Sequence, residues 1–486
     1  MKSLVSLLKN TPHKLKGAAD AKISSVCYNS KNADTGSLFV CIKGIKTDGH
    51  NYAGGAYDKG ARVFVCEKEL SLPDDATIVI VPDSRAALAD ISAEFFDHPE
   101  RSLKIIGITG TKGKSTVAHM IRHILESSGI RTGIIGTCGI SIGNVTHPTE
   151  NTTPESYELF LALYEMVLAG CKCAVMEVSS QAMLLDRVRG IHFFAAVMTN
   201  LSPDHIGPGE HSDFESYKNC KKALFMRTEN AVLNADDAFF GEFSRAARGK
   251  NVLSYSVYSE SDFHGIELSS LENALGKSFT ITENGISVTF CVPLPGDFSV
   301  YNSLAAIAVC SLLGVSLREC AEALPTVTVP GRFETVSTEG SAMFVIDYAH
   351  NGESMEKAIA ALRECNPLRL ICLFGSVGCR TQLRRRDLGK AASSADFCII
   401  TSDNPDTENP DSIIDEIAVN VTSPYVRFAD RAQAIKYAVE NSEAGDIVLL
   451  AGKGHENYQI LGTEKIHYDE REIVMQILDD GANFEK

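Results

Sequence analysis

The sequence has no excess of positive charge, no long hydrophobic run and no paired cysteines. Its 486 residues carry a formal net charge of −16, which argues against a nucleic acid or an anionic membrane as a partner. No apolar run approaches the roughly 20 residues that a membrane-spanning helix needs. The 14 cysteines form no CxxC pair, so we interpret them as buried thiols of a reducing compartment. MKSLVSLLKN at the start lacks the apolar core of a signal peptide, and we expect a cytoplasmic protein.

The sequence does contain a regular alternation of apolar strands with helices and polar loops. Its apolar content of 44% suits packed cores, and its length suggests about two to four domains. DHPERS (97–102) and LPTVTVPGR (324–332) are predicted breaks, and apolar runs that end in polar loops resume after each. We predict an α/β protein of three domains: a smaller N-terminal α/β domain (1–98), a central P-loop-type domain with a mostly parallel sheet and helices (99–330) and a C-terminal Rossmann-like α/β domain (331–486).

The segment GITGTKGKST (107–116) lies between a predicted strand and a predicted helix, where helix amides favour anions. The helix is predicted from apolar residues at 117, 120, 121, 124 and 125, which share one face. The glycines allow a phosphate to approach, Lys114 can reach terminal phosphates, and the Ser115 or Thr116 hydroxyl can meet Mg²⁺. Because the first glycine of the strict P-loop pattern is missing, an ordinary glycine-rich turn is the alternative.

Three further polar positions stand in the same part of the chain. Glu177 ends an apolar run, and a carboxylate there suits Mg²⁺, although a solvated acid is the alternative. His205 stands in a loop, where a lone histidine is more often a plain surface residue. Lys221 and Lys222 are adjacent, which is typical of a solvated helix face. Their positions in the sequence leave these alternatives open.

One turn-rich segment, TSDNPDTENP (401–410), gathers acids without a basic residue. Asp403, Asp406 and Glu408 stand among two prolines and two asparagines that favour a surface loop. The partner of these carboxylates is either solvent or a cation.

The compact loop G-T-K-G-K-S resembles the signature G-T-x-G-K-S/T-S/T of the Mur ligase superfamily, and the resemblance extends from roughly residue 25 to residue 470. It is strongest to the UDP-N-acetylmuramyl-tripeptide synthetases. The resemblance implies an ATP-dependent amide ligase with two Mg²⁺ ions that makes a peptidoglycan precursor. In that reaction a free diamino acid attacks an acyl phosphate of UDP-N-acetylmuramoyl-L-alanyl-D-glutamate. Folylpolyglutamate synthases share the superfamily, but Ser115 after Lys114 favours the Mur side. We expect a monomer.

The resemblance also assigns roles to individual residues. It implies that the catalytic residues are Lys114, Glu177, His205 and Lys221. It implies that ATP is bound by Gly110, Thr111, Lys112, Gly113, Lys114, Ser115 and Thr116. It implies metal ligands at Ser115, Glu177, His205 and Lys221, the last as a carbamate made from CO₂. An ordinary lysine has a pKa of about 10.4, so burial or nearby cations must first favour the neutral amine. It implies that the nucleotide-peptide is contacted by Ser30, Thr152, Thr153, Ser179 and Arg187.

The last third of the chain carries the resemblance in LPGDFSVYN (294–302), PGRFE (330–334), DYAHN (347–351) and AGKGHENYQ (451–459). These motifs imply that the nucleotide is also contacted by Asn302, Arg332, Asp347 and His350. The resemblance implies that the incoming amino acid is bound by Arg380, Asp403, Asn404, Asp406, Gly452 and Glu456.

Two departures from the family pattern bear on the substrate. FGSVGCRTQLRRRDLGK (374–390) differs most, and its Arg384–Arg386 run is either a solvated basic face or a holder of a distal carboxylate. Family members specific for meso-diaminopimelate read D-N-P-R where this chain has Asp406. A carboxylate there would repel a distal carboxylate and attract an ammonium, so we predict L-lysine over meso-diaminopimelate. The alternatives are a folylpolyglutamate-type ligase and a non-catalytic nucleotide-binding paralogue.

Overall fold

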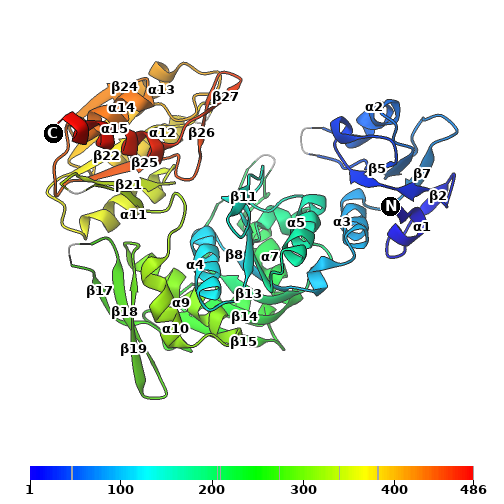
Figure 1. The fold of residues 1–486 in the computed structure, drawn as a ribbon, viewed down its shortest axis with the longest axis horizontal. Helices are drawn as coiled ribbons and strands as arrows, with labels where there is room; N and C mark the ends of the chain where they lie inside the picture. The colour runs from blue at the N-terminus through cyan, green and yellow to red at the C-terminus, as the bar shows by residue number, and fades with distance from the viewer. Residues whose placement is uncertain are drawn as a thin grey trace. The chain divides into compact units, whose positions relative to one another are not determined.

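The computed structural model describes residues 1–44, 47–204, 206–207, 210–272, 274–338, 340–379 and 382–484. Contacts divide the chain into two compact units, Met1–His264 with Leu304–Cys320, and Gly265–Ser303 with Ala321–Lys486 (Figure 1). Both units combine mainly parallel sheets with helices, which confirms the predicted α/β class. The three domains with boundaries at 98 and 330 remain a prediction, because a division into two units by contacts does not test them.

The first unit begins with a five-stranded sheet that is covered on both faces. Its order is β2-β7-β6-β5-β4, and all neighbours except β2 and β7 run parallel. Leu38 and Val40 of β5 enter one core, whereas Phe39 enters the other, so residues 38–40 are apolar on both faces of the sheet. The elements of this part are β1 (Lys2–Ser3), α1 (Leu4–Leu7), β2 (Lys14–Lys16), β3 (Lys22–Ile23), β4 (Ser25–Cys27), β5 (Ser37–Val40), α2 (Ala53–Asp58), β6 (Val63–Cys66), β7 (Thr77–Ile80) and α3 (Ser84–Phe95).

A nine-stranded sheet forms the rest of the first unit, in the order β11-β10-β9-β12-β8-β13-β14-β15-β16. All neighbouring strands pair parallel, except that β10 pairs antiparallel with both β9 and β11 at one edge. Since parallel strands share one carboxyl edge, the loops after β8, β12 and β13 lie side by side. The strands are β8 (Lys104–Thr109), β9 (Thr132–Gly136), β10 (Gly139–Ile142), β11 (Val145–His147), β12 (Cys173–Glu177), β13 (Phe193–Met198), β14 (Thr228–Asn234), β15 (Asn251–Ser256) and β16 (Phe263–His264).

Helix α4 (Lys114–Ser127) packs on this sheet against β8, β9 and β12. Val117, Met120, Ile121, Ile124 and Leu125 are all buried, which confirms the predicted apolar face. The other helices of the first unit are α5 (Ser156–Leu168), α6 (Ser180–Leu184), α7 (Phe214–Ala223) and α8 (Phe240–Ala246), and α9 (Asp297–Leu312) and α10 (Leu317–Ala323) contribute residues to both units.

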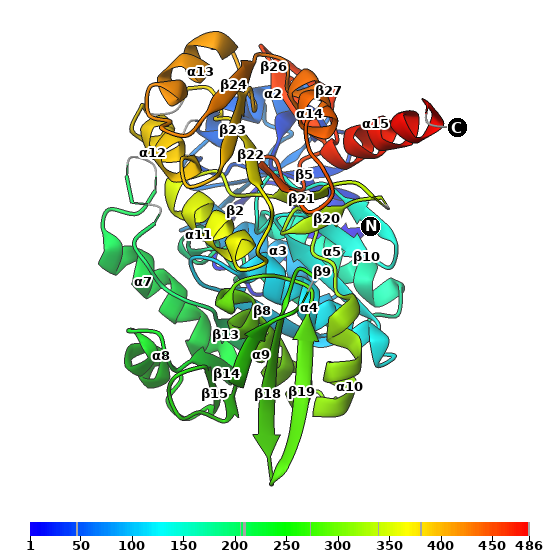
Figure 2. The ribbon, with the colours of Figure 1, turned by 90° about the vertical axis from the view of Figure 1, so that its left-hand side faces the viewer.

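The second unit contains a six-stranded sheet of order β20-β21-β25-β22-β23-β24, parallel except for β20. A separate antiparallel sheet contains β18 and β19, which form a long hairpin (Figure 2). The strands are β17 (Ile266–Ser270), β18 (Lys277–Glu283), β19 (Ile286–Val292), β20 (Glu334–Val336), β21 (Met343–Asp347), β22 (Leu370–Phe374), β23 (Phe397–Thr401), β24 (Tyr425–Phe428), β25 (Ile447–Ala451), β26 (Tyr458–Leu461) and β27 (Glu464–His467). The helices are α11 (Gly352–Arg363), α12 (Gln382–Ala392), α13 (Pro410–Ala418), α14 (Arg431–Glu440) and α15 (Glu470–Phe484). Among the helices within the described ranges, none is both long and apolar enough to cross a bilayer.

Candidate active site

The phosphate loop (residues 110–116) joins β8 to α4 and is held in shape by the loop after β13. Gly110 has a φ of +144°, and a Cβ there would lie 1.9 Å from Thr199 Oγ1, so a side chain is excluded. Asn200 holds the backbone of Lys112 from both sides: its Nδ2 donates to Lys112 O at 3.0 Å, and its Oδ1 accepts from Lys112 N at 2.9 Å. The phosphate loop is therefore held by the loop that follows a neighbouring strand of the same sheet.

Helix α4 begins at this loop with Gly113 as its N-cap, and no described side chain caps it. Uncapped amides of a first turn, together with the helix dipole, favour an anion. Ser115 and Thr116 lie in that turn and are buried, whereas Lys112 is partly exposed and pairs with Asp204 at 3.4 Å. The arrangement suits the phosphates of a nucleotide. The alternative interpretation, an ordinary glycine-rich turn, does not explain why the first turn of α4 has no side-chain cap.

Two lysine side chains converge on one carbonyl oxygen of the phosphate loop. Lys114 Nζ donates to Gly110 O at 2.9 Å, and Lys221 Nζ donates to the same oxygen at 2.8 Å. Lys221 lies on α7, is 2% exposed and sits over the Tyr217 ring. Burial, and then the charge of Lys114, lower the pKa of Lys221 well below its usual range. The alternative of a solvated lysine is wrong for Lys221, which is disposed to be a neutral amine.

Glu177 ends β12, the strand beside β8, and its carboxylate meets the phosphate loop. Ser115 Oγ donates to Glu177 Oε1 at 2.9 Å, and Thr137 N donates to the same oxygen at 2.9 Å. Glu177 is 2% exposed, so the alternative of a solvated acid is wrong. A carboxylate beside a serine hydroxyl is the hard oxygen donor set that Mg²⁺ prefers, so these residues fit the ion.

The predicted metal set is only partly within the described residues. His205, the second predicted metal ligand, lies outside them, as does Arg380. Within the described ranges, no group of three or more His, Cys, Asp or Glu side chains could hold a metal ion. The metal-binding roles of Ser115, Glu177 and Lys221 therefore stay predictions that the local geometry fits.

Four residues predicted to contact the nucleotide-peptide gather beside Glu177. Thr153 Oγ1 donates to Glu177 O at 2.9 Å and accepts from Ser179 N at 3.1 Å. Arg187 Nη1 donates to Thr153 O at 3.0 Å. Thr152 precedes Thr153 in the same loop. These contacts connect the predicted peptide-binding residues to the predicted metal ligand.

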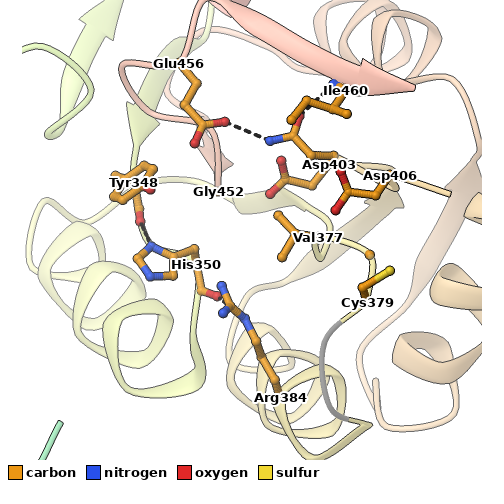
Figure 3. Close-up of a pocket in the computed structure, with 12 residues that line it drawn as sticks. Tyr348, His350, Val377, Cys379, Arg384, Asp403, Asp406, Gly452, Glu456 and Ile460 are labelled. Atoms are coloured by element: carbon orange, nitrogen blue, oxygen red, sulfur yellow. Dashed lines mark hydrogen bonds between the residues drawn. The ribbon is translucent and has the colours of Figure 1, made fainter. Parts of the chain in front are cut away.

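A cavity of about 390 Å³ opens at the carboxyl ends of the strands in the second unit (Figure 3). We call it the amino-acid pocket. All the predicted amino-acid contacts within the described residues line it, namely Asp403, Asn404, Asp406, Gly452 and Glu456. His350, Tyr348 and Arg384 also line it, and Figure 3 shows Arg384 entering on a different side from the acids. The acidic loop therefore does not simply face solvent.

Hydrogen bonds that involve backbone groups connect the loops around the amino-acid pocket. Gly378 N donates to Asn404 O at 2.8 Å, and a Cβ on Gly378 would lie 1.9 Å from Pro405 O. Gln459 Nε2 donates to Asp403 O at 2.6 Å, and Ile460 N donates to Asn404 Oδ1 at 3.1 Å. The segment that departs most from the family pattern is thus fitted closely to the acidic loop.

The three consecutive arginines of α12 have different surroundings. Arg384 lines the pocket, and its Nε donates to His350 O at 3.2 Å. Arg385 is 2% exposed and pairs with Glu408 and Glu416. Arg386 pairs with the adjacent Asp387 at the surface. The interpretation as one solvated basic run is therefore wrong, because a helix directs successive side chains to different faces.

The remaining predicted contacts lie in separate places. Asp347 ends β21, accepts from Phe333 N at 3.0 Å and has a pKa raised by burial, which Arg332 opposes. The Arg332 guanidinium lies over the Tyr348 ring at 5.0 Å. Asn302 is buried in α9, and Ser30 begins the 3₁₀ helix Ser30–Asn32. The structure does not test the roles of these residues.

Three residues at these sites were missed by the sequence reasoning. Thr137 donates to Glu177, Asn200 holds the phosphate loop, and Lys453 lies buried behind the amino-acid pocket. Thr137 and Asn200 each follow a strand of the nine-stranded sheet, and that position was the available signal.

Three family models match the chain: "Mur ligase family, catalytic domain" at 22–96, "Mur ligase middle domain" at 108–310 and "Mur ligase, glutamate ligase domain" at 331–454. Two curated relatives are named UDP-N-acetylmuramoyl-L-alanyl-D-glutamate–2,6-diaminopimelate ligase. The one from Caldanaerobacter subterraneus subsp. tengcongensis is 42% identical over 481 residues, which cover 98% of each chain. The one from Clostridium perfringens is 39% identical over 485 residues, which cover 98% of this chain and 99% of its own.

Solved structures agree with the sequence relatives. A structure of a UDP-N-acetylmuramoyl-L-alanyl-D-glutamate–2,6-diaminopimelate ligase is 27% identical, with a TM-score of 0.71 over 99% of both chains. A MurF structure from Acinetobacter baumannii is 19% identical, with a TM-score of 0.65 over 98% of both chains, and shows the same fold.

Proposed function

The chain belongs to the Mur ligase family, and from this premise we propose that it joins 2,6-diaminopimelate to the D-glutamate of UDP-N-acetylmuramoyl-L-alanyl-D-glutamate. It is an ATP-dependent amide ligase of the branch that adds a diamino acid. The observation that carries the catalytic part is the meeting of Glu177, Ser115, Lys114 and Lys221 around the phosphate loop. ATP and a uridine-linked sugar as substrates support the cytoplasmic location predicted from the sequence.

The geometry suits phosphoryl transfer to a carboxylate. The first turn of α4 and the Lys114 ammonium would neutralise charge on the terminal phosphates as the γ-phosphoryl passes to the substrate carboxylate. The amine of the diamino acid would then attack the acyl phosphate, and phosphate would leave. Bound Mg²⁺ would supply further positive charge, held by Glu177 and the Ser115 hydroxyl. The chain's own contribution is thus preorganised charge and position.

Lys221 is proposed to act as a carbamate. A neutral amine adds CO₂ and loses a proton, which turns a cationic side chain into an anionic one. Two observations support this role: Lys221 is buried beside Lys114, and both donate to a single carbonyl oxygen. Conversion to a carbamate would place an anion beside the Lys114 ammonium, which is an attraction, and would provide oxygen ligands for a metal.

The amino-acid pocket supports diaminopimelate, and the predicted preference for lysine is not supported. The curated relatives reported above are named for 2,6-diaminopimelate. The lysine prediction gave most weight to the acids of the pocket, with the Arg384–Arg386 run as the alternative holder of a distal carboxylate. Arg384 does line the pocket, and Lys453 contacts three of its residues. We propose that Asp406 accepts from the distal ammonium of diaminopimelate and that Arg384 binds its distal carboxylate.

Phosphate release, coupled to a colorimetric readout, tests this function with the full chain. We expect release that requires both UDP-N-acetylmuramoyl-L-alanyl-D-glutamate and meso-diaminopimelate, with a higher kcat/KM than for L-lysine. A folylpolyglutamate-type ligase would instead respond to a folate and glutamate, and a non-catalytic paralogue would respond to neither. A clear preference for L-lysine would contradict the proposed substrate.

A further inference from the structure

Lys453 is a charged side chain with no exposed surface, located in the loop after β25. Its exposure is 0%, and it does not line the amino-acid pocket. Its Nζ donates to Asn404 Oδ1 at 3.1 Å and lies 3.5 Å from Glu456 Oε2 and 3.6 Å from Asp403 Oδ1. All three partners line the pocket. The Lys453 ammonium therefore contacts polar groups that line the pocket, although Lys453 itself does not line it.

The contacts of Lys453 continue into a network that fixes the pocket. Asn404 Nδ2 donates to Glu456 Oε2 at 2.9 Å, so Asn404 is held between Lys453 and Glu456. Asp403 Oδ1 is buried and accepts no hydrogen bond from the described residues, so its charge is compensated by nearby cations, of which Lys453 lies 3.6 Å away. The rings of Tyr458 and Tyr468 lie 5.7 and 5.8 Å from the Lys453 ammonium.

Because the network around Lys453 is buried, the interactions between its charged groups are strong. Asp403 and Glu456 lie close to each other in a poorly solvated site, where like charges repel strongly. Burial raises the pKa of Glu456, and Asp403 raises it further, whereas Lys453 and the hydrogen bond from Asn404 lower it. Tyr348 and Tyr458 also face Glu456, and Arg431 faces Asp403. Lys453 is thus the cation that directly contacts both acids.

We propose that Lys453 is a positioning residue of the amino-acid pocket. Its buried ammonium holds Asn404, Asp403 and Glu456 in the orientation and charge state that accept the ammonium of an incoming diamino acid. This inference rests on the proposed function, since it takes the pocket to be the site of the diamino acid. Lys453 itself touches no substrate.

Steady-state kinetics of Lys453→Met test this role. Methionine retains most of the stem and removes the charge, so we expect KM for meso-diaminopimelate to rise about tenfold or more. KM for ATP and for the nucleotide-peptide should stay within about twofold, because neither substrate depends on these acids. Without the lysine, the pKa of Glu456 should rise further, because the charge of Lys453 lowers it. The Glu456 carboxyl of the variant should therefore bind a proton at a higher pH than that of the wild type. The ratio of variant to wild-type KM should therefore fall as pH rises and Glu456 ionises.

A matched control and a second pair of variants separate charge from structure. Lys465→Met removes an exposed lysine that lies over the Tyr458 ring at 3.6 Å, and it should leave KM unchanged. Glu456→Gln should raise KM strongly in the wild type and much less in the Lys453→Met background, since the two side chains act as one unit. Additive effects of the two changes, or a KM ratio that does not vary with pH, would overturn the proposal.

A crystal structure of the Lys453→Met chain provides a readout that does not need turnover. Displaced Asn404 and Glu456 side chains would support the positioning role, and unchanged positions would overturn it. A wild-type enzyme that releases no phosphate with any diamino acid would instead contradict the proposed function, so the two failures are distinguishable. If Lys453→Met does not fold, Lys453→Gln, which keeps a hydrogen-bond donor without the charge, must show the same pH-dependent KM ratio.

Discussion

Two buried lysines, one in each unit, have similar exposure and opposite surroundings. Lys221 is 2% exposed and shares a carbonyl oxygen with the Lys114 ammonium, whereas Lys453 is 0% exposed and contacts two carboxylates and an amide oxygen. A buried amine next to a cation is driven towards its neutral, nucleophilic form. A buried lysine between carboxylates can instead use its positive charge to hold those carboxylates in place. We propose that the same residue type serves covalent chemistry in one unit and positions other side chains in the other.

The largest effect is expected from removing the cation beside Lys221. Lys114→Ala should lower the rate of ligation more than about a hundredfold, because one preorganised charge contact is worth about 3 kcal/mol. Phosphate release under saturating substrates measures it. Lys222→Ala is the control, since Lys222 pairs with Glu242 at 3.2 Å away from the loop. If Lys114→Ala turns over within tenfold of the wild-type rate, the assignment of residues 110–116 as a phosphate-binding loop is wrong.

Lys221→Ala tests whether the neutral amine is used. We expect it to be nearly inactive and to regain part of its activity with acetate, whose oxygens can replace those of the carbamate beside Mg²⁺. Lys453→Met should not respond to acetate, which sharpens the contrast between the two lysines. Activity is measured with and without the additive at constant ionic strength. A Lys221→Ala enzyme that works normally without acetate would show that no carbamate is needed.

Arg385 extends the comparison to a third buried cation. It resembles Lys453 because it pairs with two carboxylates, Glu408 and Glu416. Arg385→Ala should lower the free energy of unfolding of the second unit by about 2 kcal/mol, less than for a fully buried pair, because both carboxylates are partly exposed. Denaturant unfolding measures it, and Arg386→Ala is the control on the same helix. Equal midpoints for the two variants would contradict the structural role of Arg385.

The smallest effect is expected at the cation that faces the pocket. Arg384→Ala should raise KM for meso-diaminopimelate about tenfold, the value of one hydrogen bond to a charged group, and should change KM for L-lysine little. L-Lysine has no distal carboxylate, so it serves as the internal control. Competition between the two substrates measures the ratio. An equal change for both would show that Arg384 does not bind the distal carboxylate.

The sequence predicted those site residues that belong to short, contiguous motifs. The glycine and lysine spacing at 110–116 predicted a phosphate loop between a strand and a helix, and the structure has β8 before this segment and α4 beginning within it. The motif AGKGHENYQ placed Gly452 and Glu456 at a strand end, and both line the amino-acid pocket. The acids of 401–410 were predicted to face a cation or solvent, and Asp403 is now seen to face Lys453.

The predicted preference for L-lysine, which the names of the relatives do not support, rested mainly on one position. Asp406 replaces an arginine of the family pattern, and the charge at that place was taken to decide the substrate. The charge of a pocket is a sum over side chains from several loops, and here Arg384 and Lys453 oppose the acids. Loops distant in sequence contribute to this sum, so a single substitution does not fix its sign.

The sequence by itself determined the family, the α/β class and the position of the phosphate loop, because these depend on short-range spacing that one strand and one helix can express. Only the tertiary structure decided which lysine has a lowered pKa and which arginine is buried. Lys221 lies 111 residues from the carbonyl it contacts, and Lys453 lies 49 residues from Asn404. Protonation and burial depend on such distant neighbours, since desolvation and Coulomb interactions act through space and not along the chain.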